Sequence, residues 1–295
     1  MKVILTAPAK INLTLRVGER LQNGYHDINT IMQTVSLSDM ITLENTGESG
    51  ITLSVSGQFA EGVPTDDNNI CLKAAKLYLQ DGLHIHIEKN IPHGAGLGGG
   101  SSDAAAVLIG INQLAMLLHA KQKGLSDEET FKMTEFISTH PNTAVLLNTL
   151  ELAAMNLGAD VPFFIRGGIR LCTGIGMDME DTEYDWGVES PRIVIAMGSE
   201  TMPTAKAYAI LDEQGADSFD KCITNKDIVN IKRLMTDGGA ARVSLSGSGS
   251  AVFAVFPGSE TLKIQKLKKN LRDGGYFCEI CEPVAYGGKV TWAQI

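Results

Sequence analysis

A run of glycines followed by two serines and an aspartate is the stretch of this chain that points most directly to chemistry. It covers residues 92–103 and reads Pro-His-Gly-Ala-Gly-Leu-Gly-Gly-Gly-Ser-Ser-Asp, with five glycines within residues 94–100. Glycine lets the backbone adopt positive φ and has no Cβ that would keep a ligand away. The N–H groups of such a loop, together with a helix that begins near Ser101, form a concave site for anions. The stretch therefore predicts a loop that binds a polyphosphate, because a plain turn needs fewer glycines.

Two common kinds of glycine loop do not fit. Gly94, Gly96 and Gly99 match the spacing G-x-G-x-x-G, but no strand ending in an acidic residue follows about 20 residues later, as a dinucleotide site requires. A Walker loop would end in Gly-Lys-Ser or Gly-Lys-Thr, whereas Ser101 and Ser102 directly follow glycine here. The two serine hydroxyls suit hydrogen bonds to phosphate or coordination of Mg²⁺.

Asp160 is the strongest candidate for a catalytic base. It is followed by the apolar residues 161–164, and a charged carboxylate beside such a run is unfavourable unless it is paired. A neighbouring cation would keep it ionised at neutral pH, and Lys10, in the mostly apolar segment 7–13, is the natural partner. Two alternatives stay open: Asp160 caps a helix or turn, and Lys10 is a surface lysine whose ammonium group reaches water.

Elements that position these residues follow from the hydrophobic periodicity. Residues 11–17 alternate and predict a half-exposed antiparallel strand, and a strand at 83–88 leads into the glycine loop. Further strands are expected at 2–6, 27–36, 39–45, 50–56, 169–173, 192–197, 276–282 and 289–292, and helices at 68–79, 144–157, 204–211, 227–237 and 259–273. Because several strands precede the glycine loop, the pattern predicts an α+β fold with an antiparallel or mixed sheet.

Three connecting segments carry their own signals. Residues 126–129 form a capping box that predicts the start of another helix, which is interrupted at 139–142. Residues 178–189 are polar and acidic and are expected to form a loop. Residues 246–250 read Ser-Gly-Ser-Gly-Ser and predict a second flexible turn between strands.

The composition limits the function classes. The 295 residues carry a net charge of −9, which argues against a nucleic-acid partner, and no uninterrupted apolar segment has the length of a membrane span. The basic residues within 263–272 have the spacing of a solvated helix face. Five scattered cysteines, including the lone C-x-x-C at 278–281, fit reduced thiols better than disulfides or zinc. We therefore expect a cytoplasmic protein with no membrane partner.

The motif Pro92-x-x-x-Gly-Leu-Gly-Gly-Gly-Ser-Ser resembles the phosphate loop of the GHMP small-molecule kinases. Its exact form is most similar to the branch of 4-diphosphocytidyl-2-C-methyl-D-erythritol kinases, and further blocks of that branch occur in order at 8–13, 24–26, 158–164, 204–208 and 246–254. The resemblance implies a two-lobed GHMP-kinase fold: an N-terminal ATP-binding domain over 1–167 and a C-terminal substrate-binding domain over 168–295. The second lobe would be a ferredoxin-like α/β sandwich, whose last strand either stays there or rejoins the first lobe.

By this resemblance, the chain would use ATP and Mg²⁺ to phosphorylate the 2-hydroxyl of 4-diphosphocytidyl-2-C-methyl-D-erythritol in the non-mevalonate isoprenoid pathway. Asp160 would take the proton from that hydroxyl, and Lys10 would orient Asp160. The residues implied in ATP binding are Pro92, His93, Gly94, Ala95, Gly96, Leu97, Gly98, Gly99, Gly100, Ser101 and Ser102, with Ser102 also a candidate Mg²⁺ ligand.

The same resemblance implies the substrate contacts. Asn12 would hold the erythritol part, and Tyr25 and His26 would receive the cytosine of the cytidine diphosphate group. Tyr208 would close an aromatic sandwich over that base. The neighbouring Thr204 and Gly247 complete the implied contacts.

The chain departs from the branch in places and leaves alternatives open. Asp27 stands where glutamate is usual, the segment from 126 to 158 is longer than expected, and that from 208 to 246 is shorter. One alternative is another GHMP small-alcohol kinase of the homoserine or mevalonate type, against which Tyr25 and His26 argue. The other is a nucleotide-binding protein without turnover, against which the retained Lys10 and Asp160 argue. The oligomeric state stays open between monomer and homodimer.

Overall fold

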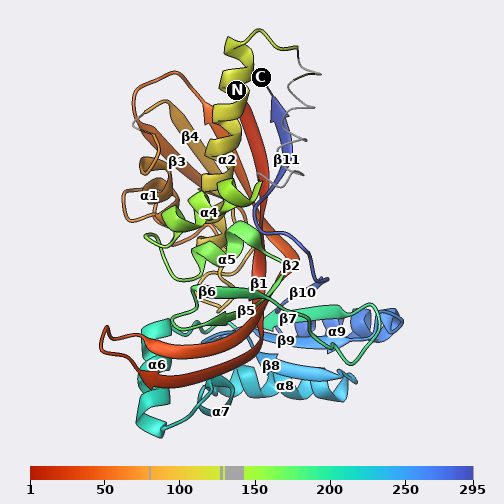
Figure 1. Cartoon of the computed structure of the whole chain (residues 1–295). Coiled ribbons are helices and arrows are strands. Elements are labelled where there is room, and N and C mark those ends of the chain that lie inside the picture. The colour runs from red at the N-terminus through yellow and green to blue at the C-terminus, as the bar shows by residue number, and fades with distance from the viewer. Residues whose placement is uncertain (80, 127–128, 130–142, 295) are drawn as a thin grey trace.

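The computed structural model describes residues 1–79, 81–126, 129 and 143–294, and it consists of two lobes joined by long strands (Figure 1). Within the described residues, seven strands form the first sheet: β1 (Lys2–Arg20), β2 (His26–Asn45), β3 (Ile51–Ser56), β4 (Leu83–Glu88), β5 (Ile169–Thr173), β6 (Asp178–Asp181) and β11 (Lys289–Gln294). The second sheet contains β7 (Arg192–Met197), β8 (Arg242–Leu245), β9 (Val252–Phe256) and β10 (Phe277–Cys281).

The helices of the described part are divided between the lobes. The first lobe contains α1 (Ile70–Lys76), α2 (Gly99–Gln122), α4 (Thr143–Ala154) and α5 (Val161–Arg166). The second lobe contains α6 (Thr204–Gln214), α7 (Phe219–Cys222), α8 (Lys226–Asp237) and α9 (Thr261–Asp273). The short α7 was not predicted from the sequence, and the helix expected after residue 126 and its break at 139–142 lie outside the described residues.

The first sheet is mixed. Its strands follow the order β11-β1-β2-β4-β3, with β5 paired to β2 and β6 to β5. The β3–β4 pair is parallel and the other pairs are antiparallel. The predicted α+β class is therefore confirmed. The last strand of the chain, β11, pairs with the first, so the first sheet contains both ends of the sequence (Figure 1).

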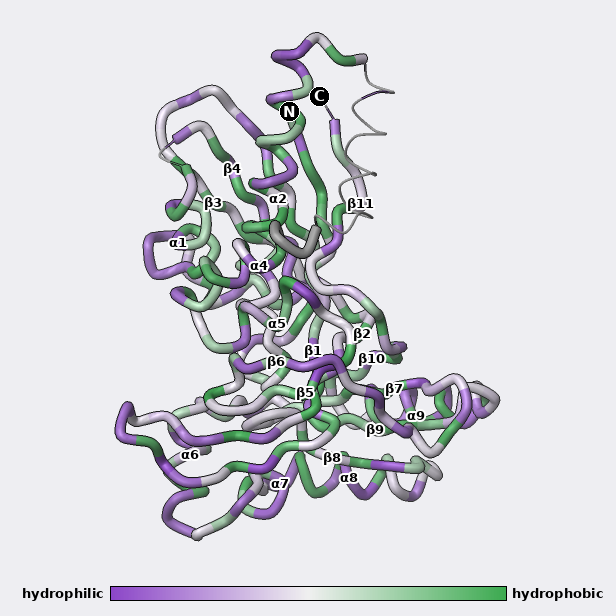
Figure 2. The backbone as a smooth tube through the Cα atoms, in the orientation of Figure 1, coloured by the Kyte–Doolittle hydropathy of each residue, from purple (hydrophilic) through white to green (hydrophobic). Residues whose placement is uncertain are grey.

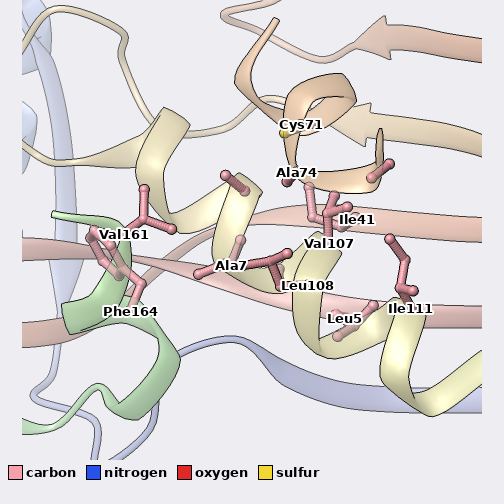
Figure 3. Packing of buried hydrophobic residues seen from close by; sticks show 14 of the residues in the cluster. Leu5, Ala7, Ile41, Cys71, Ala74, Val107, Leu108, Ile111, Val161 and Phe164 are labelled. Atoms are coloured by element: carbon pink, nitrogen blue, oxygen red, sulfur yellow. The ribbon is translucent and has the colours of Figure 1, made fainter. Parts of the chain in front are cut away.

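Helix α2 is the central core element of the first lobe and positions the glycine loop at its start. Figure 3 shows side chains of α2 and α5 packing with those of β1 and β2. A Cβ on Gly110 would lie 2.5 Å from a Leu43 methyl carbon, so glycine allows the close approach of helix and sheet. By length and composition α2 is apolar enough to cross a membrane, but most of it is buried in this lobe, as is typical of a core helix.

The hairpin of β1 and β2 extends from the first lobe into the second, where its turn lies near α6 (Figure 1). The sequence predicted two strands, at 2–6 and 11–17, but the structure has one strand with a register shift between Pro8 and Ala9. A bulge accommodates the proline without ending the strand. Val17 at the far end belongs to the core of the second lobe, whereas Leu5 belongs to the core of the first.

The second lobe is an antiparallel sheet of order β10-β7-β9-β8 packed against helices. Helix α9 buries Ile264, Leu267 and Leu271 and turns its lysines outward, as predicted. Leu262 is 87% exposed and does not belong to that apolar face. Figure 2 shows hydrophobic segments inside both sheets, whereas the turn of the long hairpin is hydrophilic.

Two connecting segments, 178–189 and 126–129, can be compared with what the sequence predicted for them. The predicted loop at 178–189 begins with β6, which pairs with β5, and Arg170 forms an ion pair with Asp181 across that pair. Its acidic residues face outward, so composition alone suggested a loop. The capping box is present: the Ser126 amide donates to Glu129 Oε2 at 2.8 Å, and the Glu129 amide donates to Ser126 Oγ at 3.3 Å. The boundary at 167–168 stays a prediction.

Candidate active site

The glycine loop connects β4 to α2 and takes a conformation that requires glycine. Gly94, Gly96 and Gly98 have φ of 66°, 78° and 72°. A Cβ on Gly96 would lie 2.1 Å from the Ser246 carbonyl oxygen, and one on Gly98 would lie 2.7 Å from the Phe164 ring. A Cβ on Gly100, by contrast, would meet no atom within 4 Å. The loop is therefore tightly packed on one side and open at the first turn of α2.

The second glycine-serine turn packs directly against this loop. Ser246 Oγ donates a hydrogen bond to the Gly96 carbonyl at 3.0 Å, and the Ala251 amide donates to the Ala95 carbonyl at 3.0 Å. A Cβ on Gly247 would lie 3.3 Å from Lys10 Nζ. The two flexible turns of the sequence thus come from different lobes and meet at one place.

A cavity of about 610 Å³ lies at this meeting point. Its volume is in the range typical of small-molecule sites. Its wall contains most of the residues predicted for the site: Lys10, Asn12, Tyr25, Pro92, His93, Gly94, Ala95, Gly96, Leu97, Gly98, Gly99, Gly100, Ser101, Asp160, Thr204, Tyr208 and Gly247. His26 and Ser102 are not in the wall.

A larger cavity of about 710 Å³ lies beyond Pro92 and His93, between the lobes. Its other lining residues include Phe59, Phe277 and Glu279, and it contains neither Lys10 nor Asp160. We therefore assign the chemistry to the smaller cavity, which holds both candidate catalytic groups.

Lys10 is a buried residue, only 5% exposed, so the surface-lysine alternative is wrong. Its Nζ donates to Asn12 Oδ1 at 2.6 Å, and Asn12 Nδ2 donates in turn to Thr30 Oγ1 at 2.8 Å. Burial lowers the pKa of the Lys10 ammonium, and the charge of Asp160 partly opposes that shift. No ion pair joins Lys10 to Asp160 among the described contacts, so Lys10 is held by the amide of Asn12.

Asp160 occupies the N-cap position of α5, as the helix-cap alternative suggested, but its side chain makes no capping hydrogen bond. The carboxylate lies instead in the cavity wall. Its charge also reaches the aromatic end of the cavity: burial raises the pKa of the Tyr208 hydroxyl, and Asp160 raises it further. Asp160 is therefore a neighbour of both Lys10 and Tyr208.

The aromatic end of the cavity has Tyr25 and Tyr208 in its wall. Tyr25 is 56% exposed, whereas Tyr208 is held by its neighbours. The His26 ring stacks on Tyr208 with centroids 4.7 Å apart and planes at 18°, and Phe219 packs edge-on at 4.9 Å. His26 Nε2 is 2.7 Å from Asp212 Oδ1. The imidazole of His26 thus packs on Tyr208 from outside the cavity wall.

Sequence reasoning missed three residues of this region. Asp212 and Phe219 hold Tyr208 and His26, and Lys89 lies in the cavity wall beneath the glycine loop. Asp212 lies one helical turn after Tyr208, a spacing that could have indicated it. Nothing in the sequence marks Phe219.

Ser102 is fully buried and its Oγ has no hydrogen-bond partner, so its assignment to ATP and Mg²⁺ stays a prediction.

Comparisons with known proteins show the family to which the chain belongs. Residues 69–168 match the GHMP kinases N terminal domain. A 4-diphosphocytidyl-2-C-methyl-D-erythritol kinase of Desulfotalea psychrophila is 36% identical, with 85% of each chain covered. The same-named kinase of Shouchella clausii is 32% identical over 95% of this chain and 92% of its own.

Solved structures show the same fold. The crystal structure of a 4-(cytidine 5'-diphospho)-2C-methyl-D-erythritol kinase matches with a TM-score of 0.60 at 26% identity, covering 96% of this chain and 99% of its own. A homoserine kinase from Cytophaga hutchinsonii matches with a TM-score of 0.64 at 18% identity, covering 98% of this chain and 97% of its own. The second likeness concerns the fold alone, so the two-lobed architecture is shared by kinases of different alcohols.

Proposed function

The chain belongs to the family of 4-diphosphocytidyl-2-C-methyl-D-erythritol kinases, and we propose that it transfers the γ-phosphoryl group of ATP to the 2-hydroxyl of 4-diphosphocytidyl-2-C-methyl-D-erythritol. This reaction belongs to the non-mevalonate route to isoprenoids. One observation supports the proposal most: the glycine loop, Lys10, Asp160 and the two tyrosines line a single cavity. A phosphate site, a base and an aromatic clamp are the parts that this substrate requires.

The proposed chemistry depends on the buried end of the cavity. As the substrate oxygen forms its bond to the γ-phosphorus, Asp160 accepts the hydroxyl proton, the bond between that phosphorus and the bridging oxygen breaks, and ADP leaves. Such transfers need positioning and charge compensation more than covalent help from the protein. Lys10 supplies a positive charge near the reacting oxygens, and its hydrogen bond to Asn12 fixes where that charge lies.

The phosphates are assigned to the loop and to the start of α2. Backbone N–H groups of residues 94–100 and the positive end of the helix stabilise negative charge. The open space at Gly100 leaves room for them. The chain fits Mg²⁺ as well, because Ser101 lines the cavity and the buried Ser102 Oγ has no partner. The hydroxyl of Ser101 would hold the ion beside phosphate oxygens, where it would neutralise phosphate charge, whereas Ser102, buried outside the cavity wall, would have to turn toward it.

The cytosine is assigned to the aromatic end. Tyr25 and Tyr208 line the cavity, and their rings would stack on the two faces of the base. We place His26 at the same end, where its ring supports Tyr208. Asn12 and Thr204 also line the cavity and would contact the erythritol and diphosphate parts.

We further propose that the chain works in the cytoplasm as a monomer or homodimer, without a nucleic-acid or membrane partner. The net charge of −9 supports the first exclusion, since nucleic acids require a basic surface. The burial of α2 supports the second.

A panel of alcohols with ATP tests the proposed function. We expect ADP release with 4-diphosphocytidyl-2-C-methyl-D-erythritol and none above background with homoserine or mevalonate. Cytidine diphosphate should compete with the alcohol, because it fills the aromatic end, and it should compete weakly with ATP. Turnover of homoserine or mevalonate alone would replace this function with that of another GHMP kinase. ATP binding without turnover of any alcohol would favour a nucleotide-binding protein.

A further inference from the structure

Three charged side chains are buried together beneath the glycine loop. Lys89 follows β4, Asp39 lies on β2, and Asp103 lies near the start of α2. Lys89 Nζ donates to Asp103 Oδ2 at 2.6 Å and also to Asp39 Oδ2. The three side chains are at most 4% exposed. We call this group the buried triad, and nothing in the proposed chemistry uses it.

The buried triad contacts the chain on both sides of the glycine loop. On the entry side, Asp39 Oδ1 accepts hydrogen bonds from the backbone amides of Asn90 and Ile91, the latter at 2.8 Å. On the exit side, Asp103 belongs to the first turns of α2. Lys89 lies between them, and a Cβ on Gly99 would be 3.3 Å from its Nζ. The ammonium group of Lys89 therefore links Asp39, at the entry to the glycine loop, with Asp103, at its exit.

The triad is a costly way to stabilise a fold. Removing three charges from water has a large penalty, and apolar residues of similar volume often stabilise a core as well or better. The penalty is visible at Asp103, where burial raises the pKa well above the usual carboxyl range and the charge of Asp39 adds to the shift. Burial disfavours the charge of Asp103, although the two carboxylates raise the pKa of Lys89 despite its burial. A cluster with such a cost is better explained by what it positions than by the stability it adds.

We propose that Asp39, Lys89 and Asp103 are positioning residues for nucleotide binding, which hold the two ends of the glycine loop so that its amides face the phosphates. The inference rests on the proposed function, because it requires that the loop binds a nucleotide. Fixing a loop in its binding conformation before the ligand arrives removes an ordering cost from binding. The acceptor alcohol should be unaffected, since the triad does not contact the aromatic end.

The two carboxylates of the triad are not equivalent, and this gives a sharp test. Both oxygens of Asp39 are used, one by Lys89 and the other by two backbone amides. In Asp39→Asn, the new NH₂ group must face one of these donors, so a contact is lost. Asp103 Oδ1 has no hydrogen-bond partner, so Asp103→Asn can keep its oxygen on Lys89 and place NH₂ at the free position.

The experiment measures the dissociation constant of MgADP by calorimetry, together with the KM of ATP and of the acceptor. We expect Asp39→Asn and Lys89→Met to weaken MgADP binding by about 10- to 100-fold, as small misplacements of binding groups do. Asp103→Asn should stay within about threefold of wild type, because its hydrogen bond to Lys89 is kept. The acceptor KM should not change in any of them. Lys268→Met, which removes a partly exposed pair with Glu279, serves as the matched control.

The outcomes separate the two proposals. If wild type binds no MgADP, the proposed function fails and the inference with it. If wild type binds but the KM of ATP and of the acceptor change together in Asp39→Asn and Lys89→Met, the triad supports the fold in general and the inference alone fails. Thermal unfolding is measured in parallel; if both variants are unfolded, the triad is a stability element and the positioning role is overturned. Equal effects of Asp39→Asn and Asp103→Asn would also contradict it.

Discussion

The two ends of the active-site cavity are built differently. At the phosphate end, positive-φ glycines and buried charges fix the backbone, and Lys10 is held by a hydrogen bond to Asn12. At the aromatic end, Tyr25 is 56% exposed, and Tyr208 depends on stacking with His26 from the long hairpin. The first end belongs mainly to one lobe, whereas the second forms only where β2 meets α6. We therefore expect changes at the phosphate end to alter turnover or nucleotide affinity, and changes at the aromatic end to alter acceptor affinity.

The largest effect is expected for Asp160→Asn. The amide keeps the size of the carboxylate but cannot accept the proton, so kcat should fall by about 10²- to 10⁴-fold, the usual contribution of a general base. Because Asp160 makes no capping hydrogen bond, the melting temperature should stay near that of wild type. Steady-state kinetics measures kcat, and thermal unfolding measures the melting temperature. A kcat near that of wild type would remove the role of Asp160 as base.

A side chain at Gly100 should break the phosphate end without disturbing the fold. A Cβ there meets no atom within 4 Å, so Gly100→Val projects into the space assigned to phosphate. We expect nucleotide affinity to fall by about 100-fold, a loss of about 2.7 kcal/mol.

Gly98→Ala is the informative contrast to that variant. Its Cβ would lie 2.7 Å from the Phe164 ring at a φ of 72°, so it should lower the melting temperature, whereas Gly100→Val should not. Unchanged MgADP affinity in Gly100→Val would mean that the phosphates lie elsewhere.

How far the sequence predicts this site differs between the two ends. The glycine pattern of 94–100 dictates backbone geometry directly, so the loop can be recognised from its residue types alone. The proposed catalytic pair was inferred from the cost of placing Asp160 and Lys10 among apolar residues, although the contact of Lys10 with Asn12 was missed. The α+β class followed from strands that precede the loop. The sequence did not predict that the strands expected at 2–6 and 11–17 join into the single strand β1, because a proline usually indicates the end of a strand.

The remaining parts depend on contacts between distant segments. His26 was expected to face the ligand, but its position depends on where α6 packs against the hairpin. The buried triad joins Asp39 and Asp103 to Lys89, which lies 50 and 14 residues away from them in sequence. No local pattern predicts such pairings, since each requires the register of the whole first lobe.

Removing a tyrosine ring tests the aromatic end of the cavity in the same way. Stacking of a base on an aromatic side chain contributes about 1–3 kcal/mol, so Tyr208→Ala should raise the acceptor KM by about 5- to 150-fold. Tyr25→Ala should have a smaller effect, because that ring is more exposed. Tyr78→Ala, an exposed tyrosine outside the cavity wall, is the control. A change in the KM of ATP that matches the change for the acceptor would contradict the division into two ends.

The pH dependence of kcat should report on Lys10. Burial lowers its pKa, and only the charged ammonium compensates phosphate charge, so activity is present below that pKa and falls as pH rises through it. Beyond it, kcat should decrease by about tenfold per pH unit at most. In Lys10→Arg, whose guanidinium stays charged, this alkaline decrease should be absent even if kcat is lower. The same alkaline limb in both proteins would assign it to another group.

The smallest expected effect lies behind the aromatic end, at Asp212. Its carboxylate accepts from His26 but is 40% exposed, so water weakens the charge contribution of the pair. Asp212→Asn keeps an oxygen for the imidazole and should leave the acceptor KM unchanged. Asp212→Ala frees the ring that stacks on Tyr208, and one lost hydrogen bond of about 1 kcal/mol corresponds to an increase of about fivefold in that KM. The KM of ATP should not change in either variant. If Asp212→Ala lowered kcat instead, Tyr208 would contribute to the chemical step, and the two ends could not be treated as separate.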